Sequence, residues 1–398
     1  MKKLFLAYIL LCFCFFSFSS QAFAANTEEE FPNTEEESEM EEQLIEEIPT
    51  DDIARYWDDI QNEYSDYMPD SAKKTVKDMI KQDEGISIVE GIKGVLKFLV
   101  LEVIENGKLL GTLLLLTIFS RLLQTVHEAF DKSTVSKIAY FVVYIVLIYI
   151  VLSSFHQVFS YARDTVTMMS DFMIALLPLM LGLLASFGQV ISVSFFHPVI
   201  IFMVHVSGLL ISKFIFPLLY LSALLLIIGQ LNEHFPLTHL ADLFKTVSVG
   251  SLVIFLSLFL GIISIQGTAS AVQDGVALKT TKFITGNFIP VVGRTFTDAA
   301  DTVLSTLLLM KNTIGLVGLI ILIFIAVFPA IKILVISFIY KLCAALLQPL
   351  GNNPVISSLA IVSKHIMYIL ACVITMAFMF VLTIIIMIIA SNIPLLLR

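Results

Sequence analysis

From Leu109 to its C-terminus, the chain is a nearly continuous series of apolar segments of membrane length, interrupted by one polar passage at 267–312. A segment of about 20 predominantly apolar residues is long enough to cross a bilayer as an α-helix. The pattern therefore predicts an all-α polytopic membrane protein. Clear spans are expected at 109–125, 138–159, 248–265 and 366–390.

Two longer apolar blocks, 197–231 and 313–347, are ambiguous. At a rise of about 1.5 Å per residue, each block could form two thin or tilted crossings. Lys213 and Lys332 stand near the middle of the blocks, where a turn would fall. Counting each block as two crossings gives about eight transmembrane helices, and seven or nine remain open.

Proline-containing dipeptides indicate an internal repeat. Leu177-Pro178 and Ile289-Pro290 are 112 positions apart, and Phe216-Pro217 and Phe328-Pro329 are separated by the same offset. Chance similarity in a chain rich in Leu and Ile is the alternative. The two copies are expected at 168–266 and 280–392.

The orientation of these copies depends on 171–189, which could be a re-entrant hairpin. Each copy would then contain three crossings, and an odd number makes the copies inverted. Inverted repeats entered by broken segments recur in membrane proteins that move solutes. In this eight-crossing arrangement the polar passage faces the cytoplasm, and arrangements of seven or nine crossings place it outside.

The N-terminus has the features of a cleavable signal peptide. Lys2 and Lys3 precede an apolar core at 4–18 and the small-x-small site Ala22-Phe23-Ala24. An uncleaved first helix is the alternative. The chain is therefore divided into a signal peptide at 1–24, an acidic disordered linker at 25–53, an extracytoplasmic amphipathic helical region at 54–106 and a membrane domain at 107–398.

The polar passage is the first place to look for a function. Its residues Gly286 to Gly293 carry helix breakers on both sides of a short apolar core, which favours a membrane-dipping turn. Asp298 and Asp301 share one face of the following helix, either as a cation- or proton-sensing pair or as a capping cluster near the helix start. The candidate functional residues are Asp274, Lys279, Lys282, Asn287, Pro290, Gly293, Asp298 and Asp301.

Composition and charge narrow the function classes. The chain is 58% hydrophobic with a mean hydropathy of +0.92, and fifteen of its acidic residues lie within 26–60. The remainder is mildly basic without a clustered cationic face, so nucleic-acid binding is not expected. The sequence has no zinc-ligand spacing, catalytic serine elbow or phosphate-binding glycine loop, so we expect neither enzymatic activity nor a cofactor or metal.

Three stretches of the chain carry a family resemblance, the longest in and after the polar passage. They run from Tyr56-Trp57 to Tyr67-Met68-Pro69, from Glu105 to Tyr140, and from Asp274 to Gly315. These stretches resemble stage III sporulation protein AE of endospore-forming bacteria.

This resemblance implies a non-enzymatic scaffold or channel subunit, multi-pass in the mother-cell membrane that surrounds the forespore. Its complex would support late forespore-specific sigma factor activity. Membrane lipid, other stage III A proteins and, indirectly, stage II sporulation protein Q would be the partners. A secondary transporter or exporter of a small solute is the alternative.

Overall fold

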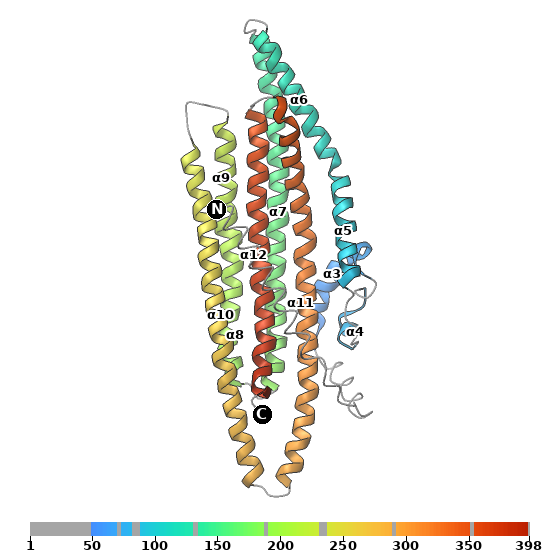
Figure 1. The fold of residues 1–398 in the computed structure, drawn as a ribbon, viewed down its shortest axis with the longest axis vertical. Coiled ribbons are helices and arrows are strands. Elements are labelled where there is room, and N and C mark those ends of the chain that lie inside the picture. Colours follow the sequence, from blue (N-terminus) through green and yellow to red (C-terminus); the bar gives the residue numbers. More distant parts are fainter. Residues whose placement is uncertain are drawn as a thin grey trace. The chain divides into compact units, whose positions relative to one another are not determined.

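A computed structural model describes residues 49–69, 73–81, 88–129, 134–186, 190–230, 237–288, 292–350 and 354–396, and the predicted signal peptide lies outside this part of the chain. Every regular element in these ranges is helical, which confirms the all-α prediction. Residues 48–398 form one compact unit. Figure 1 shows long helices packed side by side, with shorter ones against them.

The N-terminal part of this unit consists of short helices followed by a long rod. The short elements are α3 (Asp51–Tyr64), the 3-10 turn η1 (Ser65–Tyr67) and α4 (Val76–Lys81). The rod joins α5 (Ile88–Glu105) to α6 (Gly107–Ala129), with only Asn106 between them. Backbone hydrogen bonds from Asn106 N to Glu102 O and from Leu110 N to Asn106 O, at 3.1 and 3.2 Å, continue the helical path.

The remaining helices cross the unit in alternating directions (Figure 1). One set runs toward the α10–α11 connection, which we call the hairpin end, and the other runs away from it. The helices that run toward the hairpin end are α7 (Thr134–Ser186), α10 (Thr238–Phe288) and α12 (Pro354–Leu396). The helices that run away from it are α6, the α8–α9 rod and α11 (Val292–Leu347). The α8–α9 rod consists of α8 (Val190–Leu209), the π-helical η3 (Leu210–Ile215) and α9 (Phe216–Gly229), and the 3-10 turn η4 (Gln348–Leu350) follows α11.

Both ambiguous blocks form one helical rod each, so the prediction of two crossings per block is wrong. Lys213 lies in the π-helical turn η3 inside the α8–α9 rod, and Lys332 lies in the interior of α11. Residues 171–186 likewise continue α7, which contradicts a re-entrant hairpin at 171–189. A turn would release several backbone hydrogen bonds in apolar surroundings, which is costlier than keeping one lysine on a helix.

These corrections change the expected repeat. The copies at 168–266 and 280–392 each contain the end of one helix, then one complete rod or helix, then all or part of the next helix: α8–α9 with most of α10 in the first copy, and α11 with most of α12 in the second. Two traversals per copy give the copies the same direction, as Figure 1 shows, so the expected inversion is wrong. Whether the copies share an ancestry stays a prediction.

Five helices in the described part of the chain are long and apolar enough to cross a membrane. These helical segments are 28 to 46 residues long, and each contains an apolar stretch of 18 residues. At about 1.5 Å per residue the segments measure about 42 to 69 Å, whereas the bilayer hydrocarbon core is about 30 Å thick. Each helix is therefore longer than the part that a bilayer needs to cover.

Small residues bring the central helices close together. The hydroxyl of Ser337 on α11 donates to Ser363 O on α12 at 3.0 Å, and the hydroxyl of Ser363 donates to Ser337 O at 2.9 Å. A Cβ added at Gly318 of α11 would lie 2.8 Å from the Leu176 side chain of α7. Short side chains of this kind let helix backbones approach in membrane bundles.

A single glycine allows α5 to pack against η1. A Cβ at Gly94 would overlap the backbone carbonyl of Tyr67. Gly94→Ala should cost about 1 to 3 kcal/mol by overpacking, which corresponds to roughly a 5- to 150-fold larger fraction of molecules with α3 and η1 released. Limited trypsin digestion at Arg55 and Lys73 in detergent-solubilised protein measures this release.

Gly91→Ala is the matched control, because no atom lies within 4 Å of its added Cβ. Alanine at this helical position should leave cleavage unchanged or slower, since it favours the helix by up to about 1 kcal/mol. Equal cleavage of both variants would contradict the close packing of α5 on η1.

Candidate functional site

The polar passage forms the two helical arms of the hairpin end. Asp274, Lys279, Lys282 and Asn287 lie in the last turns of α10, and Gly293, Asp298 and Asp301 lie in the first turns of α11. Pro290 and the side chains of the other seven candidates lie outside the described residues. The fold thus brings the two halves of the passage to one end of the unit, and a functional role for these eight residues stays a prediction.

The structure refines one local expectation for this passage and contradicts another. Gly286 and Gly293 lie inside α10 and α11, so the connection between these helices is shorter than 286–293, and a membrane-dipping turn there stays a prediction. Because α11 begins at Val292, its first turn contains no acidic residue. Asp298 and Asp301 therefore do not form an N-terminal capping cluster.

A cluster around Lys332 attaches the N-terminal helices to the bundle. The ammonium of Lys332 lies 2.8 Å from Glu63 Oε1, 5.0 Å from the Tyr64 ring centroid and 5.8 Å from the Tyr161 ring centroid. The Tyr64 ring stacks on Phe328, with 4.3 Å between centroids. We call Glu63, Tyr64, Tyr161, Phe328 and Lys332 the Lys332 cluster. The Lys332 ammonium, which suggested a turn in the sequence, is instead paired with side chains of α3.

Aromatic contacts extend this attachment along α3. The buried Trp57 ring packs edge-on against Phe324 of α11, and its Nε1 donates to Lys74 O at 2.9 Å. Tyr56 packs edge-on against Phe172 of α7. Apolar positions at helical spacing in 53–64 therefore bind one face of α3 to two long helices, while its carboxylates remain exposed.

Electrostatics at the cluster favour an ionised Glu63. Burial alone would raise the pKa of its carboxyl, but the hydrogen bond and the charge of Lys332 outweigh burial and lower the pKa below its ordinary value. A carboxyl whose pKa is lower in the folded state than in the unfolded state stabilises the fold at pH values above its unfolded-state pKa. That contribution is lost as the pH falls through the folded-state pKa. The contribution is small because the Glu63 side chain is 59% exposed.

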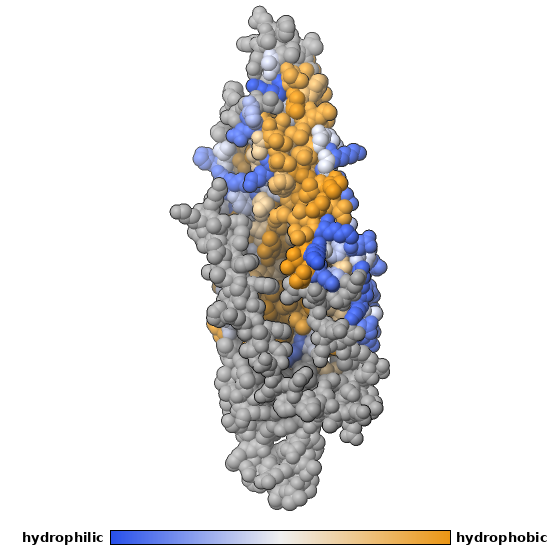
Figure 2. All heavy atoms as spheres, turned by 45° about the vertical axis from the view of Figure 1, so that its right-hand side comes forward, coloured by the Kyte–Doolittle hydropathy of each residue, from blue (hydrophilic) through white to orange (hydrophobic). Residues whose placement is uncertain are grey.

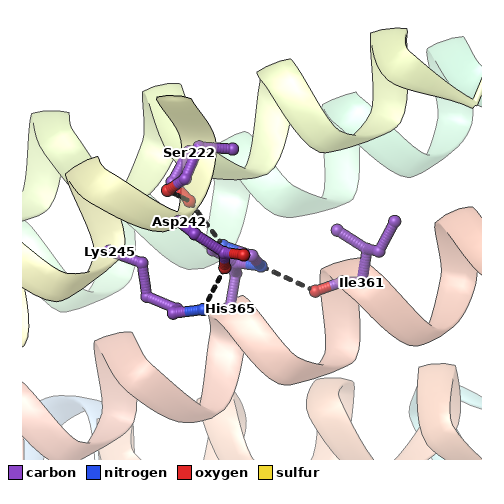
Figure 3. A network of polar contacts seen from close by, with 6 residues as sticks. Ser222, Asp242, Lys245, Ile361 and His365 are labelled. Carbon is purple, nitrogen blue, oxygen red and sulfur yellow. Dashed lines mark hydrogen bonds and ion pairs between the residues drawn. The ribbon is translucent and has the colours of Figure 1, made fainter. Parts of the chain in front are cut away.

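A second polar cluster joins α9, α10 and α12 inside the bundle (Figure 3). The hydroxyl of Ser222 lies 2.7 Å from Ala241 O and 3.1 Å from His365 Nε2, and His365 Nδ1 lies 2.9 Å from Ile361 O. Ser222 and His365 are both buried. The ion pair between Asp242 and Lys245 lies beside them on α10.

Proton counting shows what this cluster can do chemically. The Ile361 carbonyl can only accept, so Nδ1 of the neutral ring carries the proton and donates to it, which leaves Nε2 as an acceptor. The hydroxyl proton of Ser222 is then shared between Ala241 O and His365 Nε2. The cluster therefore fixes one tautomer of a buried neutral His365.

The sequence did not predict this cluster. Ser222 and His365 are 143 positions apart and share no local motif. Within the described part of the chain, no group of three or more His, Cys, Asp or Glu side chains is placed to hold a metal ion.

Comparison with known proteins gives a consistent result. Residues 71–391 match the family model described as stage III sporulation protein AE. The chain is 49% identical to stage III sporulation protein AE of Bacillus subtilis (strain 168) over 369 residues, which cover 92% of each protein. No solved structure matches the chain.

The buried serine provides a test of the second cluster. Ser222→Ala should lower the free energy of unfolding by about 1 to 3 kcal/mol, because it removes the hydrogen-bond partner of a buried imidazole nitrogen. Thermal unfolding in detergent measures the change. Ser257→Ala is the control, since Ser257 is exposed and bonds only to Val253 O of its own helix in this structure. Its effect should stay within about 0.5 kcal/mol, and an equal effect of both variants would contradict the cluster.

Proposed function

The chain belongs to the stage III sporulation protein AE family, and from this premise we propose that it is a membrane component of the channel or secretion complex that links mother cell and forespore. The match to a family member over 92% of both chains carries the proposal. The chain would act as a non-enzymatic scaffold or channel subunit in the mother-cell membrane around the forespore. Other stage III A proteins and, indirectly, stage II sporulation protein Q would be its partners.

The same proposal includes the organisation of the chain. A signal peptide at 1–24 exports a short acidic linker at 25–53 and the helical region at 54–106, and residues 107–398 form the membrane domain. The attachment of α3 to α7 and α11 supports this division in part, because it shows an amphipathic region held against the bundle by side-chain contacts. Late forespore-specific sigma factor activity would depend on the assembled complex.

The direction of the helices supports a particular side for the polar passage. Starting from α5, the rod of α6 runs away from the hairpin end, α7 returns, α8–α9 runs away and α10 returns (Figure 1). When α6 is counted as the span expected at 109–125, in addition to the five apolar helices, an even number of traversals separates 54–106 from the hairpin. If the leader exports 54–106, the arms that hold Asp274 to Asp301 face the same extracytoplasmic space. This arrangement replaces the cytoplasmic placement that eight crossings would give.

Complementation separates a scaffold from a transporter. A Bacillus subtilis strain that lacks its own stage III AE protein receives this chain, and heat-resistant spores are counted. We expect the double variant Asp298→Asn, Asp301→Asn to restore sporulation, because a scaffold does not need these carboxylates to carry an ion. A chain that lacks residues 54–106 should not restore sporulation, so its spore count should equal that of the deletion strain that receives no gene. The reverse pattern would favour the secondary transporter.

Cysteine labelling tests the sides of the membrane. Cysteine is introduced at Asp58 on α3, at Thr281 in the hairpin arm of α10 and at Gln348 at the opposite end of α11. The native Cys343 and Cys372 are buried. A membrane-impermeant maleimide added to protoplasts should label the first two positions, and Gln348 should react only after permeabilisation.

Two results would contradict different parts of this proposal. Labelling of Asp58→Cys without Thr281→Cys would contradict the even number of traversals. Labelling of both only after permeabilisation would contradict export of the N-terminal region and leave the helix directions unaffected.

A further inference from the structure

Helix α7 exposes a continuous polar face in the middle of its length. Between residues 153 and 171 every exposed side chain is polar, whereas Ile145 and Val146 before this interval and Ile174 after it are exposed and apolar. The polar side chains recur every three to four residues, which places them on one side of the helix. We call this set the α7 polar face. It consists of Ser153, His156, Gln157, Ser160, Arg163, Asp164, Thr167 and Asp171.

The opposite side of the same segment belongs to the core of the bundle, where Phe155, Val158 and Val166 are fully buried. On the polar face, Gln157 Nε2 donates to the Tyr161 hydroxyl at 2.7 Å. The hydroxyl of Ser160 donates to Asp164 Oδ2 at 3.3 Å. Both bonds join residues of α7, so they do not attach the face to a neighbouring helix.

Two contacts with the α8–α9 rod give the height of the polar face in the bundle. The Phe155 ring stacks on Tyr220 of α9, with 5.3 Å between centroids. A Cβ added at Gly208 of α8 would lie 2.6 Å from Ser170 Oγ. The rod therefore runs beside the α7 polar face from Gly208 to Tyr220.

This part of the rod presents apolar side chains to the outside. It belongs to the segment Pro198–Gly229, which is long and apolar enough to cross a membrane. Leu209, Phe214 and Leu221 are exposed on it. Lys213 is the one charged residue in this stretch. The same layer of the molecule thus carries side chains suited to hydrocarbon on α8–α9 and a polar face on α7.

Carboxylates of α3 lie on the same side of the molecule as the α7 polar face. Tyr56 of α3 packs edge-on against Phe172 of α7, with 5.7 Å between ring centroids. Burial, and then the nearby charges of Asp171 and Asp52, raise the pKa of the Tyr56 hydroxyl. Figure 2 shows hydrophilic groups beside a long hydrophobic band on the face that carries α3 and α5. Because free carboxylates avoid the hydrocarbon core, this side of the molecule faces water.

We propose that the α7 polar face lines a water-filled channel through the membrane layer, along which hydrophilic solutes move. The face is about 27 Å long at about 1.5 Å per residue, close to the hydrocarbon thickness of about 30 Å. Ionisable side chains at membrane depth face a bundle interior or a water-filled cavity. Arg163 and Asp164 give the face both signs of charge, so the channel does not select solutes of one sign.

This inference rests on the proposed function and deepens it, because it names the surface of the channel subunit that a solute contacts. It assigns the solute path to α7 and not to the polar passage at 267–312. Since the face lies at the surface of one chain, another subunit of the complex forms the second wall of the channel.

Cysteine accessibility along α7 tests whether the face is hydrated from end to end. Ser153→Cys, Ser160→Cys and Thr167→Cys are introduced one at a time into the full-length chain. Membranes from sporulating cells are opened by freezing and thawing and treated with a positively charged methanethiosulfonate. The reagent reacts with the thiolate, which apolar surroundings disfavour. We therefore expect all three positions to react.

Leu209→Cys and Phe214→Cys are the matched controls, because both positions are exposed on the α8–α9 rod at the same height. Each should react at least about tenfold more slowly than the α7 positions, since lipid keeps the thiol protonated. The unsubstituted chain, whose Cys343 and Cys372 are buried, gives the background rate. Equal rates at the control and α7 positions would overturn the channel, because the layer would then lie in bulk water. Slow reaction at any of the three α7 positions would also overturn it.

Spore counts separate this inference from the proposed function. Each cysteine variant should restore heat-resistant spores in the complementation experiment, and a variant that fails is replaced by Gln157→Cys or Asp164→Cys on the same face. Unreactive α7 positions in variants that restore spores would overturn the channel and leave the proposed function intact. Failure of the unsubstituted chain to restore spores would contradict the proposed function, whatever the labelling rates.

Discussion

The need to pair every backbone amide and carbonyl within apolar surroundings determines this structure. Helices are the only open-chain elements that satisfy this need within one segment. The consequence is a set of helices of 43 to 56 residues in α7, α10, α11 and α12 that continue through positions where polar side chains or prolines occur. Pro178 and Pro329 lie inside helices for the same reason. Polar side chains are then accommodated one at a time.

The polar side chains inside the bundle form contacts between helices. Lys332 binds α3 to the bundle through Glu63 and the Tyr64 ring, and Ser337 and Ser363 join α11 to α12. Ser222 and His365 connect α9, α10 and α12. Each contact fixes the relative height of two helices, which apolar side chains of similar size would specify poorly. These contacts thereby give the helices a defined register.

The arrangement gives the two ends of the unit different characters. The hairpin end carries the polar arms of α10 and α11, on the side from which the α5–α6 rod departs (Figure 1). The opposite end carries the short connections after α6, α9 and η4. The proposed function uses the polar end for contact with partners and the apolar body for the membrane.

The sequence by itself determined that the protein is helical and membrane-embedded, because the length of an apolar segment and the helical spacing of its residues do not depend on tertiary contacts. It also located the amphipathic α3 and α5, and it carried the resemblance to the family. The number of helices in the blocks around Lys213 and Lys332 depended on tertiary structure, because a lone lysine suggests a turn until its partner on a distant helix is known. The pairing of Ser222 with His365 likewise required the fold, since only packing brings residues 143 positions apart into hydrogen-bond contact.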